Sequence, residues 1–430
     1  MRRIRSVTVA GLAAVVAVVA TALAVALPAS SAHTNASAAA GSTTVDFYSS
    51  LPLSGSSVAQ TGPAVNGIKL ALKQAGNKAG HYKINYTSLN DATAAAGQWT
   101  PEATSANARK AASDPNAVYY MGEFNSGASE VSMPILNLAG IAQDSPANTY
   151  VGLTVPLKGV TAAAEPNKYF PSGKRTYTRI VPIDTVQGAA DLQALQQAGC
   201  KKLAIFDDTQ AYGAGLAAVL KATAPMYGMK VVDVMSDANV ESNYTSVASK
   251  FQSDGAQCVE LSATTASVGG TAFVKAVSQA LPHAKILGPD GMCTTAWATN
   301  VQVLCTVATQ DMKAYPGGKK FLASYKKQFH VASPDPYSIY GYESAELGLQ
   351  TLAKLPAGLS GKKLQSAFVK QLFKTKNVNS VLGTFSINPN GDTTLTSYGL
   401  YKLAPTKSGK ADVQTWDKTL KPSKVMKTAS

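Results

Sequence analysis

Two segments in the first half of the chain combine small hydroxyl residues with turn formers. The segment 121–127 reads MGEFNSG and joins a short apolar run to a helical pattern, and 144–149 reads DSPANT after the next apolar run. The hydroxyls of Ser126 and Thr149, together with free backbone N–H groups at a helix start, can hold a carboxylate. Ordinary helix capping and turn formation produce the same pattern. Both interpretations stand at this point.

Two further residues, later in the chain, can contact a ligand. Asp290 lies in the sequence GPDG at 288–291, and Tyr212 follows the sequence DDTQ at 207–210 and opens a helical pattern. An aspartate in such a turn is most often a turn residue. The tyrosine is either a cover between structural units or the wall of a pocket.

Motifs for nucleophilic catalysis and for phosphate binding are absent from the sequence. There is no GxSxG, GxxxxGK[ST] or HExxH segment, and no GxGxxG follows the first strand. The cysteines show no CxxC spacing and the four histidines are far apart, so we expect no zinc site and no cofactor. We assign no catalytic residue. These absences favour a binding protein over an enzyme.

The N-terminus has the composition of an export signal. Residues 1–5 are cationic, 7–27 carry no charge, and small residues lead to Ala32. We expect a signal peptide at 1–32 and a spacer at 33–42, with a retained membrane anchor as the alternative. Since no cysteine precedes Cys200, a lipoprotein anchor is excluded, and the expected location is extracellular or a periplasm-like space.

Composition and charge agree with an exported globular protein. The net charge is +14, and removing the three arginines of the leader leaves +11, most of it scattered lysine. No element concentrates arginine and aromatic residues, so nucleic acid is not an expected partner. In an oxidising compartment Cys200, Cys258, Cys293 and Cys305 most simply form two disulfides, for which three pairings exist.

Strand and helix patterns alternate in two series. The first runs from about 44 to 138 and the second from about 177 to 308, which predicts an α/β fold with two doubly wound parallel sheets. Past Pro316 come three helical patterns and then two strands, near 381–387 and 396–403. The remainder, 406–430, is rich in lysine and lacks a sustained apolar period, so we expect a weakly ordered tail.

Several segments, in this order, resemble one known family. They are LPLSG at 51–55, the Gly122 to Ser126 turn, SPA at 145–147, Asp207 to Gly213, GPDG at 288–291, and GTF at 383–385 followed by NGD at 390–392. The chain resembles the type I periplasmic binding proteins of ABC importers, specifically the leucine/isoleucine/valine-binding branch. The resemblance covers about 43–405.

The resemblance implies two hinged lobes joined by three crossovers. Lobe one would be 43–180 and 317–378, and lobe two 181–316 and 379–405, with crossovers near 181–182, 316–317 and 380. In the strand order 2-1-3-4-5, Cys200 and Cys258 lie at the same edge of neighbouring strands. We therefore predict the disulfides Cys200–Cys258 and Cys293–Cys305.

The resemblance also implies roles for six residues. Ser126 and Thr149 would hold a ligand α-carboxylate, and Ala147 would offer a backbone carbonyl to the α-ammonium. Asp290 would pair with that ammonium, and Tyr212 would close over the ligand from lobe two. Thr264 would line the ligand site after the third strand of lobe two, at a position where the family often has tyrosine or glycine.

The expected function is capture of a small amino-acid-like ligand, with branched-chain amino acids among the candidates, for delivery to the membrane permease of an ABC importer. We expect a monomer. A ligand sensor on the same fold is the first alternative, and a secreted enzyme is the second.

Overall fold

Strands and helices alternate in two series, as the sequence patterns predict. The computed structural model describes residues 43–269, 271–294, 301–404 and 413–428, and within the unit 41–430 they belong to one compact body. The predicted signal peptide and spacer lie outside the described residues. Of the helices that are described, none is both long and apolar enough to cross a membrane.

Lobe one contains a six-stranded sheet of order β2-β3-β1-β4-β5-β6, in which all pairs except β2–β3 are parallel. Its strands are β1 (Thr43–Leu51), β2 (Lys78–Ala79), β3 (Tyr82–Asn90), β4 (Ala117–Gly122), β5 (Ala142–Ser145) and β6 (Tyr177–Arg179). Its helices are α1 (Val58–Gln74), α2 (Pro101–Ser113), α3 (Ser126–Ala139), α8 (Gly318–Phe329), α9 (Tyr337–Ala353) and α10 (Gly361–Leu372).

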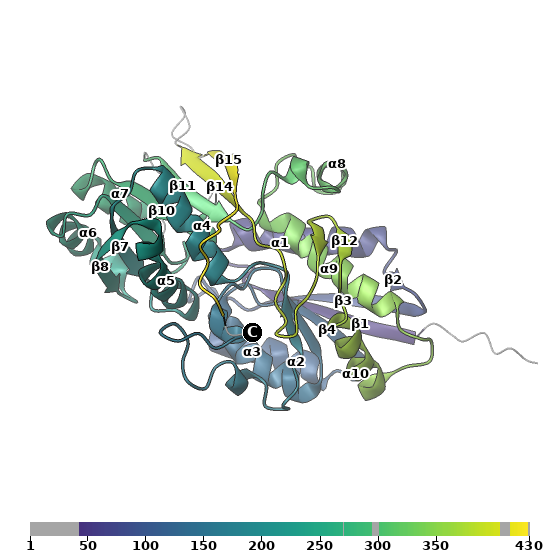
Figure 1. Cartoon of the computed structure of the whole chain (residues 1–430). Helices are drawn as coiled ribbons and strands as arrows, with labels where there is room; N and C mark the ends of the chain where they lie inside the picture. Colours follow the sequence, from purple (N-terminus) through teal and green to yellow (C-terminus); the bar gives the residue numbers. More distant parts are fainter. Residues whose placement is uncertain (1–42, 270, 295–300, 405–412, 429–430) are drawn as a thin grey trace, which may run out of the picture. The chain divides into compact units, whose positions relative to one another are not determined.

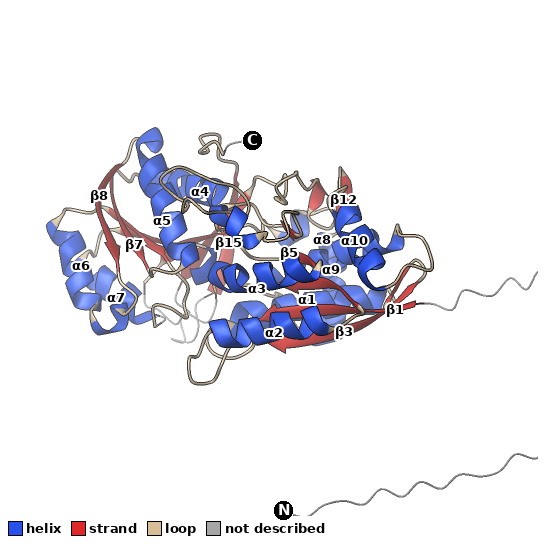
Figure 2. Ribbon diagram, turned by 90° about the horizontal axis from the view of Figure 1, so that it is seen from below, coloured by secondary structure: helices blue, strands red, loops and turns tan. Residues whose placement is uncertain are grey.

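The two faces of this sheet bury alternate residues of the same strands. Phe47 and Tyr119 point toward Phe368 of α10, whereas the next residues, Tyr48 and Tyr120, belong to the cluster packed by α2 and α3. Because both faces are covered, the central strand β4, of sequence AVYYMG, is buried along its whole length. Helices cover both sides of the sheet, and α9 returns from late in the sequence to pack beside α1 (Figures 1 and 2).

Lobe two contains a seven-stranded sheet of order β15-β14-β11-β10-β9-β7-β8, in which β14 runs antiparallel to both of its neighbours, β11 and β15, and the other pairs are parallel. Its strands are β7 (Lys202–Asp207), β8 (Lys230–Ser236), β9 (Cys258–Ser262), β10 (Lys285–Gly288), β11 (Val303–Val307), β14 (Tyr398–Ala404) and β15 (Val413–Leu420). Its helices are α4 (Asp184–Gln197), α5 (Ala211–Thr223), α6 (Tyr244–Ser253) and α7 (Thr271–Ala280). The predicted doubly wound α/β fold is confirmed.

Both predicted disulfides are present. Cys200 lies just before β7 and Cys258 begins the neighbouring strand β9, with Cα atoms 5.9 Å apart. Cys293 follows β10 and is bonded to Cys305 in β11, with Cα atoms 5.4 Å apart. Each bond joins neighbouring segments of lobe two, as the strand order requires.

The third passage between the sheets lies later than predicted. Residues after 379 still contact lobe one, because the N–H of Val381 donates to Glu343 of α9 and Asp392 forms a bridge to Arg179 at the end of β6. A short hairpin precedes that bridge, β12 (Val378–Ser380) with β13 (Gly383–Phe385). The sheet of lobe two resumes only at Tyr398, so the crossover lies between 392 and 398 rather than at 380.

The expectation of a weakly ordered tail is wrong for β15. This strand pairs antiparallel with β14 in a register that sets Leu420 opposite Tyr398, and the Leu420 side chain is 1% exposed. The polar residues of the strand, Lys418 among them, hid its period, because one face of an edge strand lies in solvent. Beyond it, Lys424 donates to the carbonyl of Met226, and Met426 packs against apolar residues of both lobes around Val151.

Leu420→Ala tests whether β15 belongs to the folded core. We expect a loss of about 2 to 5 kcal/mol in the free energy of unfolding, since the change removes a buried leucine side chain. Urea denaturation of the variant and of Lys421→Ala, which alters an exposed neighbour, measures the difference. Equal stability of the two variants would mean that the strand contributes nothing.

Candidate functional site

All six residues predicted to bind a ligand line one cavity with an empty volume of about 270 Å³. Ser126, Ala147 and Thr149 come from lobe one, and Tyr212, Thr264 and Asp290 come from lobe two. The residues follow strands β4, β5, β7, β9 and β10, and the carboxyl ends of parallel strands are where doubly wound sheets bind ligands. The structure therefore brings the six together from both lobes.

The lobe-one wall of the cavity is the N-terminal end of α3. Ser126 is the first residue of this 14-residue helix, and the preceding residue, Asn125, makes no side-chain cap. The first N–H groups of a helix have no partner within the helix and carry partial positive charge. Thr149 lies on the loop after β5 and lines the same wall. This end of the cavity suits a carboxylate.

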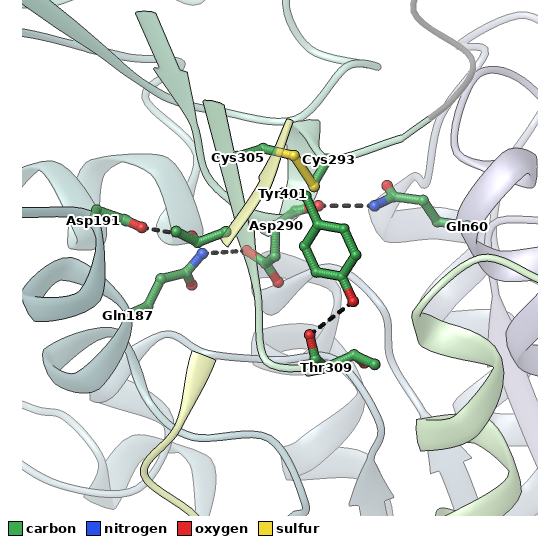
Figure 3. Close-up of a disulfide and its surroundings, with 9 residues drawn as sticks. Gln60, Gln187, Asp191, Asp290, Cys293, Cys305, Thr309 and Tyr401 are labelled. Carbon is green, nitrogen blue, oxygen red and sulfur yellow. Dashed lines mark hydrogen bonds between the residues drawn. A yellow bond between two sulfur atoms is a disulfide. The ribbon is translucent and has the colours of Figure 1, made fainter. Parts of the chain in front are cut away.

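The lobe-two wall is centred on the Asp290 carboxyl group, which is 5% exposed. One of its oxygens accepts hydrogen bonds from Tyr212 and from Gln187, the latter at 2.7 Å, and the other oxygen accepts one from Tyr337. Gln60 of α1 donates to the Asp290 backbone carbonyl at 2.8 Å (Figure 3). The three donors to the carboxylate, Tyr212, Gln187 and Tyr337, are neutral, so they solvate it without cancelling its charge.

Burial dominates the protonation of this region. It raises the pKa of Asp290 above its usual range, while the hydrogen bonds from Tyr212, Tyr337 and Gln187 oppose that rise. Burial, with a contribution from the charge of Asp290, also raises the pKa of Asp184 to about 8. A positive charge beside Asp290 would favour its ionised form and remove part of this cost.

Four residues of the cavity wall were not assigned a binding role from the sequence: Phe124, Asn125, Gly291 and Tyr337. The first three adjoin assigned residues, and strand-end position could have identified them. Tyr337 begins α9, almost fifty residues from Asp290, and no local signal marks it. Among the described residues, no group of three or more His, Cys, Asp or Glu side chains could hold a metal ion.

Glu123 precedes the cavity residues but turns away from the cavity. Tyr120 donates to its carboxyl group at 2.8 Å within the core of lobe one. Burial raises the pKa of Glu123 well above its usual range, and the charge of Asp91 raises it further. Burial also raises the pKa of Asp91, to about 7. The two buried carboxyl groups therefore hold a proton up to near-neutral pH.

A buried arginine organises the loop that carries Thr149. The Arg179 guanidinium group is fully buried and forms an ion pair with Asp392 at 2.7 Å. It also donates to the backbone carbonyls of Asn148, at 3.3 Å, and Tyr150, at 2.7 Å, the residues on either side of Thr149. Arg179 thus joins the third crossover to one wall of the cavity.

The comparison with protein families identifies the chain. A family model described as periplasmic binding protein matches residues 49–410. The chain belongs to this family. The resemblance inferred from the sequence motifs is therefore confirmed.

Two curated relatives match this periplasmic binding protein over 209 residues each. One is a Leu/Ile/Val-binding protein homolog from Brucella melitensis, 26% identical over 47% of the chain and 54% of the relative. The other is an amino acid binding protein from Pseudomonas aeruginosa, 24% identical over 47% of the chain and 53% of the relative. The chain thus spans about half the length of these relatives.

Solved structures share the fold over most of the chain. A leucine-binding protein from Thermotoga maritima has a TM-score of 0.69 at 20% identity and covers 88% of this chain and 99% of its own. A branched-chain amino acid transporter substrate-binding protein from Streptococcus pneumoniae, in complex with isoleucine, has a TM-score of 0.68 at 16% identity, with coverages of 87% and 99%. A solute-binding protein from Rhodopseudomonas palustris, in complex with p-hydroxybenzoic acid, has a TM-score of 0.71 at 16% identity, with coverages of 88% and 97%.

Arg179→Met tests the role of the buried ion pair. The variant leaves Asp392 buried without its cation, and we expect a loss of about 3 to 5 kcal/mol in the free energy of unfolding. The double variant Arg179→Met, Asp392→Leu removes both charges and should recover part of that loss. Chemical denaturation of the three proteins measures this. A double variant no more stable than the single one would show that the unpaired charge is not the cause.

Asp91→Asn tests the buried carboxyl pair through pH. The folded-state pKa of about 7 exceeds the unfolded value of about 3.9, so the stabilising effect of the bound proton is full below pH ~4 and is lost as the pH rises through 7. Between pH 5 and 8 the wild type should therefore lose about 2 to 3 kcal/mol more stability than the variant. Urea titrations at both pH values, with exposed Glu102→Gln as the control, measure the slopes. Parallel curves for wild type and Asp91→Asn would contradict the assignment.

Proposed function

We propose that the protein captures a small amino-acid-like zwitterion between its two lobes and delivers it to the membrane permease of an ABC importer. The observation that carries the proposal is the Asp290 carboxyl group, buried among neutral donors and set across one cavity from the start of α3. A zwitterion supplies a cation to the first and an anion to the second. Each charge that leaves water then finds a compensating group.

The roles of the cavity residues follow from this placement. Ser126, Thr149 and the first N–H groups of α3 bind the ligand carboxylate, and Asp290 pairs with the ammonium group. The backbone carbonyl of Ala147 is a second acceptor for the ammonium. Tyr212 and Thr264 form the wall contributed by lobe two. Because the charged contacts come from opposite lobes, bound ligand favours the closed arrangement.

The ligands of the similar proteins support a small-molecule ligand that carries a carboxylate. Leucine, isoleucine and p-hydroxybenzoic acid all have one, and only the amino acids carry an ammonium group as well. Asp290 favours the amino acids, since an aromatic acid would place no cation beside the buried carboxylate. The same family resemblance supports export by cleavage of residues 1–32, action as a monomer, and a binding role rather than an enzymatic one.

Asp290→Ala tests the ammonium contact. In isothermal calorimetry with the twenty amino acids and p-hydroxybenzoic acid, at least one amino acid should bind the wild type. That ligand should bind Asp290→Ala about 30- to several-thousand-fold more weakly, because its ammonium group is left buried and unpaired. Asp290→Glu should lose less, since it keeps the charge.

Glu241→Gln, which removes an exposed carboxylate of lobe two, is the control and should bind like the wild type. If Asp290→Ala binds its best amino acid as tightly as the wild type does, the ammonium contact is wrong. If only p-hydroxybenzoic acid binds, the protein takes up aromatic acids and the amino-acid proposal fails.

A further inference from the structure

Two residues of the cavity wall carry a buried polar atom that has no partner among the described residues: Thr149, whose hydroxyl is assigned above to the ligand carboxylate, and Asn125. The Asn125 side chain lines the cavity and is 7% exposed, and its Oδ1 atom accepts no hydrogen bond from any described residue. A buried amide oxygen without a donor is costly, and such groups in native proteins usually face an ordered water or a ligand.

The position of Asn125 makes this free oxygen unusual. Asn125 is the N-cap residue of α3, where an asparagine oxygen ordinarily accepts a hydrogen bond from the helix backbone. Here the side chain makes no such bond, although the backbone carbonyl of Asn125 does accept one from Ser129 at 3.2 Å. The Asn125 amide therefore lines the cavity and does not cap α3.

The walls next to Asn125 are apolar or already hydrogen-bonded, so its amide is the polar group that a ligand side chain would contact there. The rings of Phe124 and Tyr337 pack edge to face with centroids 5.0 Å apart, which makes one wall apolar. The Thr264 hydroxyl is already within hydrogen-bond distance of Ser267, at 3.1 Å. Little free space remains between these walls, so a bound side chain must be short.

We propose that Asn125 recognises a hydrogen-bond donor on the ligand side chain, so that the cavity selects a short polar amino acid with a carboxamide or hydroxyl group over a branched aliphatic one. The inference rests on the proposed function, because it assumes that Asp290 and the start of α3 hold the ammonium and carboxylate groups common to all amino acids. An aliphatic side chain would bury the Asn125 oxygen without a donor. A site built to hydrogen-bond one group discriminates strongly against an analogue that lacks it.

The test compares polar and aliphatic ligands on the full chain and on Asn125→Leu. Calorimetry uses asparagine, glutamine, serine and threonine against leucine and valine. We expect the best polar amino acid to bind the wild type at least about tenfold more tightly than leucine, from the loss of one buried hydrogen bond. Asn125→Leu should reverse that order, because it removes the amide and adds apolar surface.

Asn167→Leu, which makes the same substitution at an exposed position outside the cavity, is the matched control and should preserve the polar preference. The melting temperature of each variant without ligand checks that it folds. A wild type that prefers leucine overturns the inference while leaving the proposed function intact. So does an Asn125→Leu variant that weakens polar and aliphatic ligands equally, because Asn125 then contacts the common ammonium group. If no amino acid binds the wild type, the proposed function itself fails and the inference fails with it.

Discussion

The central constraint in this structure is a carboxylate held out of water at the meeting point of two lobes. Asp290 belongs to lobe two, but its hydrogen-bond donors come from both: Gln187 and Tyr212 from its own lobe, and Tyr337 and Gln60 from lobe one. A buried charge needs more than neutral donors to offset its dehydration. Asp290 therefore links the two lobes. Under the proposed function it also pairs with the ligand cation, so closure of the cleft and binding of a charged ligand are coupled.

A second buried charge, on Arg179, stabilises the loop that carries Thr149 behind the opposite wall. Arg179 is fully paired, by Asp392 and by backbone carbonyls on both sides of Thr149, so it holds geometry and offers no charge to a ligand. Removing one partner of such a pair is costly, although the pair itself adds little net stability. Through Arg179, the third crossover and the Thr149 loop share one connection. Under the proposed function, a hinge movement at 392–398 would start from the residue that also holds the Thr149 loop.

The two walls of the cavity offer different groups to a ligand, which explains how one fold can bind several ligands. The start of α3 offers backbone N–H groups, which any carboxylate can use. Under the proposed function, discrimination depends on side chains that face the rest of the ligand, chiefly Asp290 and Asn125. Changing these two residues would then alter the ligand without altering the sheets, the disulfides or the crossovers. Proteins that share this fold bind different ligands, including amino acids and an aromatic acid, which agrees with that separation.

By itself the sequence predicted the alternating α/β fold, because periodicity is encoded locally, and its resemblance to the periplasmic binding proteins supplied the strand order, both disulfides and six of the cavity residues. It did not determine the order of β15, since the polar residues of an edge strand look like those of a solvated tail until β14 lies beside them. It also could not reveal Tyr337, which reaches Asp290 only because α9 returns to lobe one. Nor could it show that Asn125 faces the cavity instead of capping α3. Those facts depend on contacts between distant segments, and only packing in three dimensions decides them.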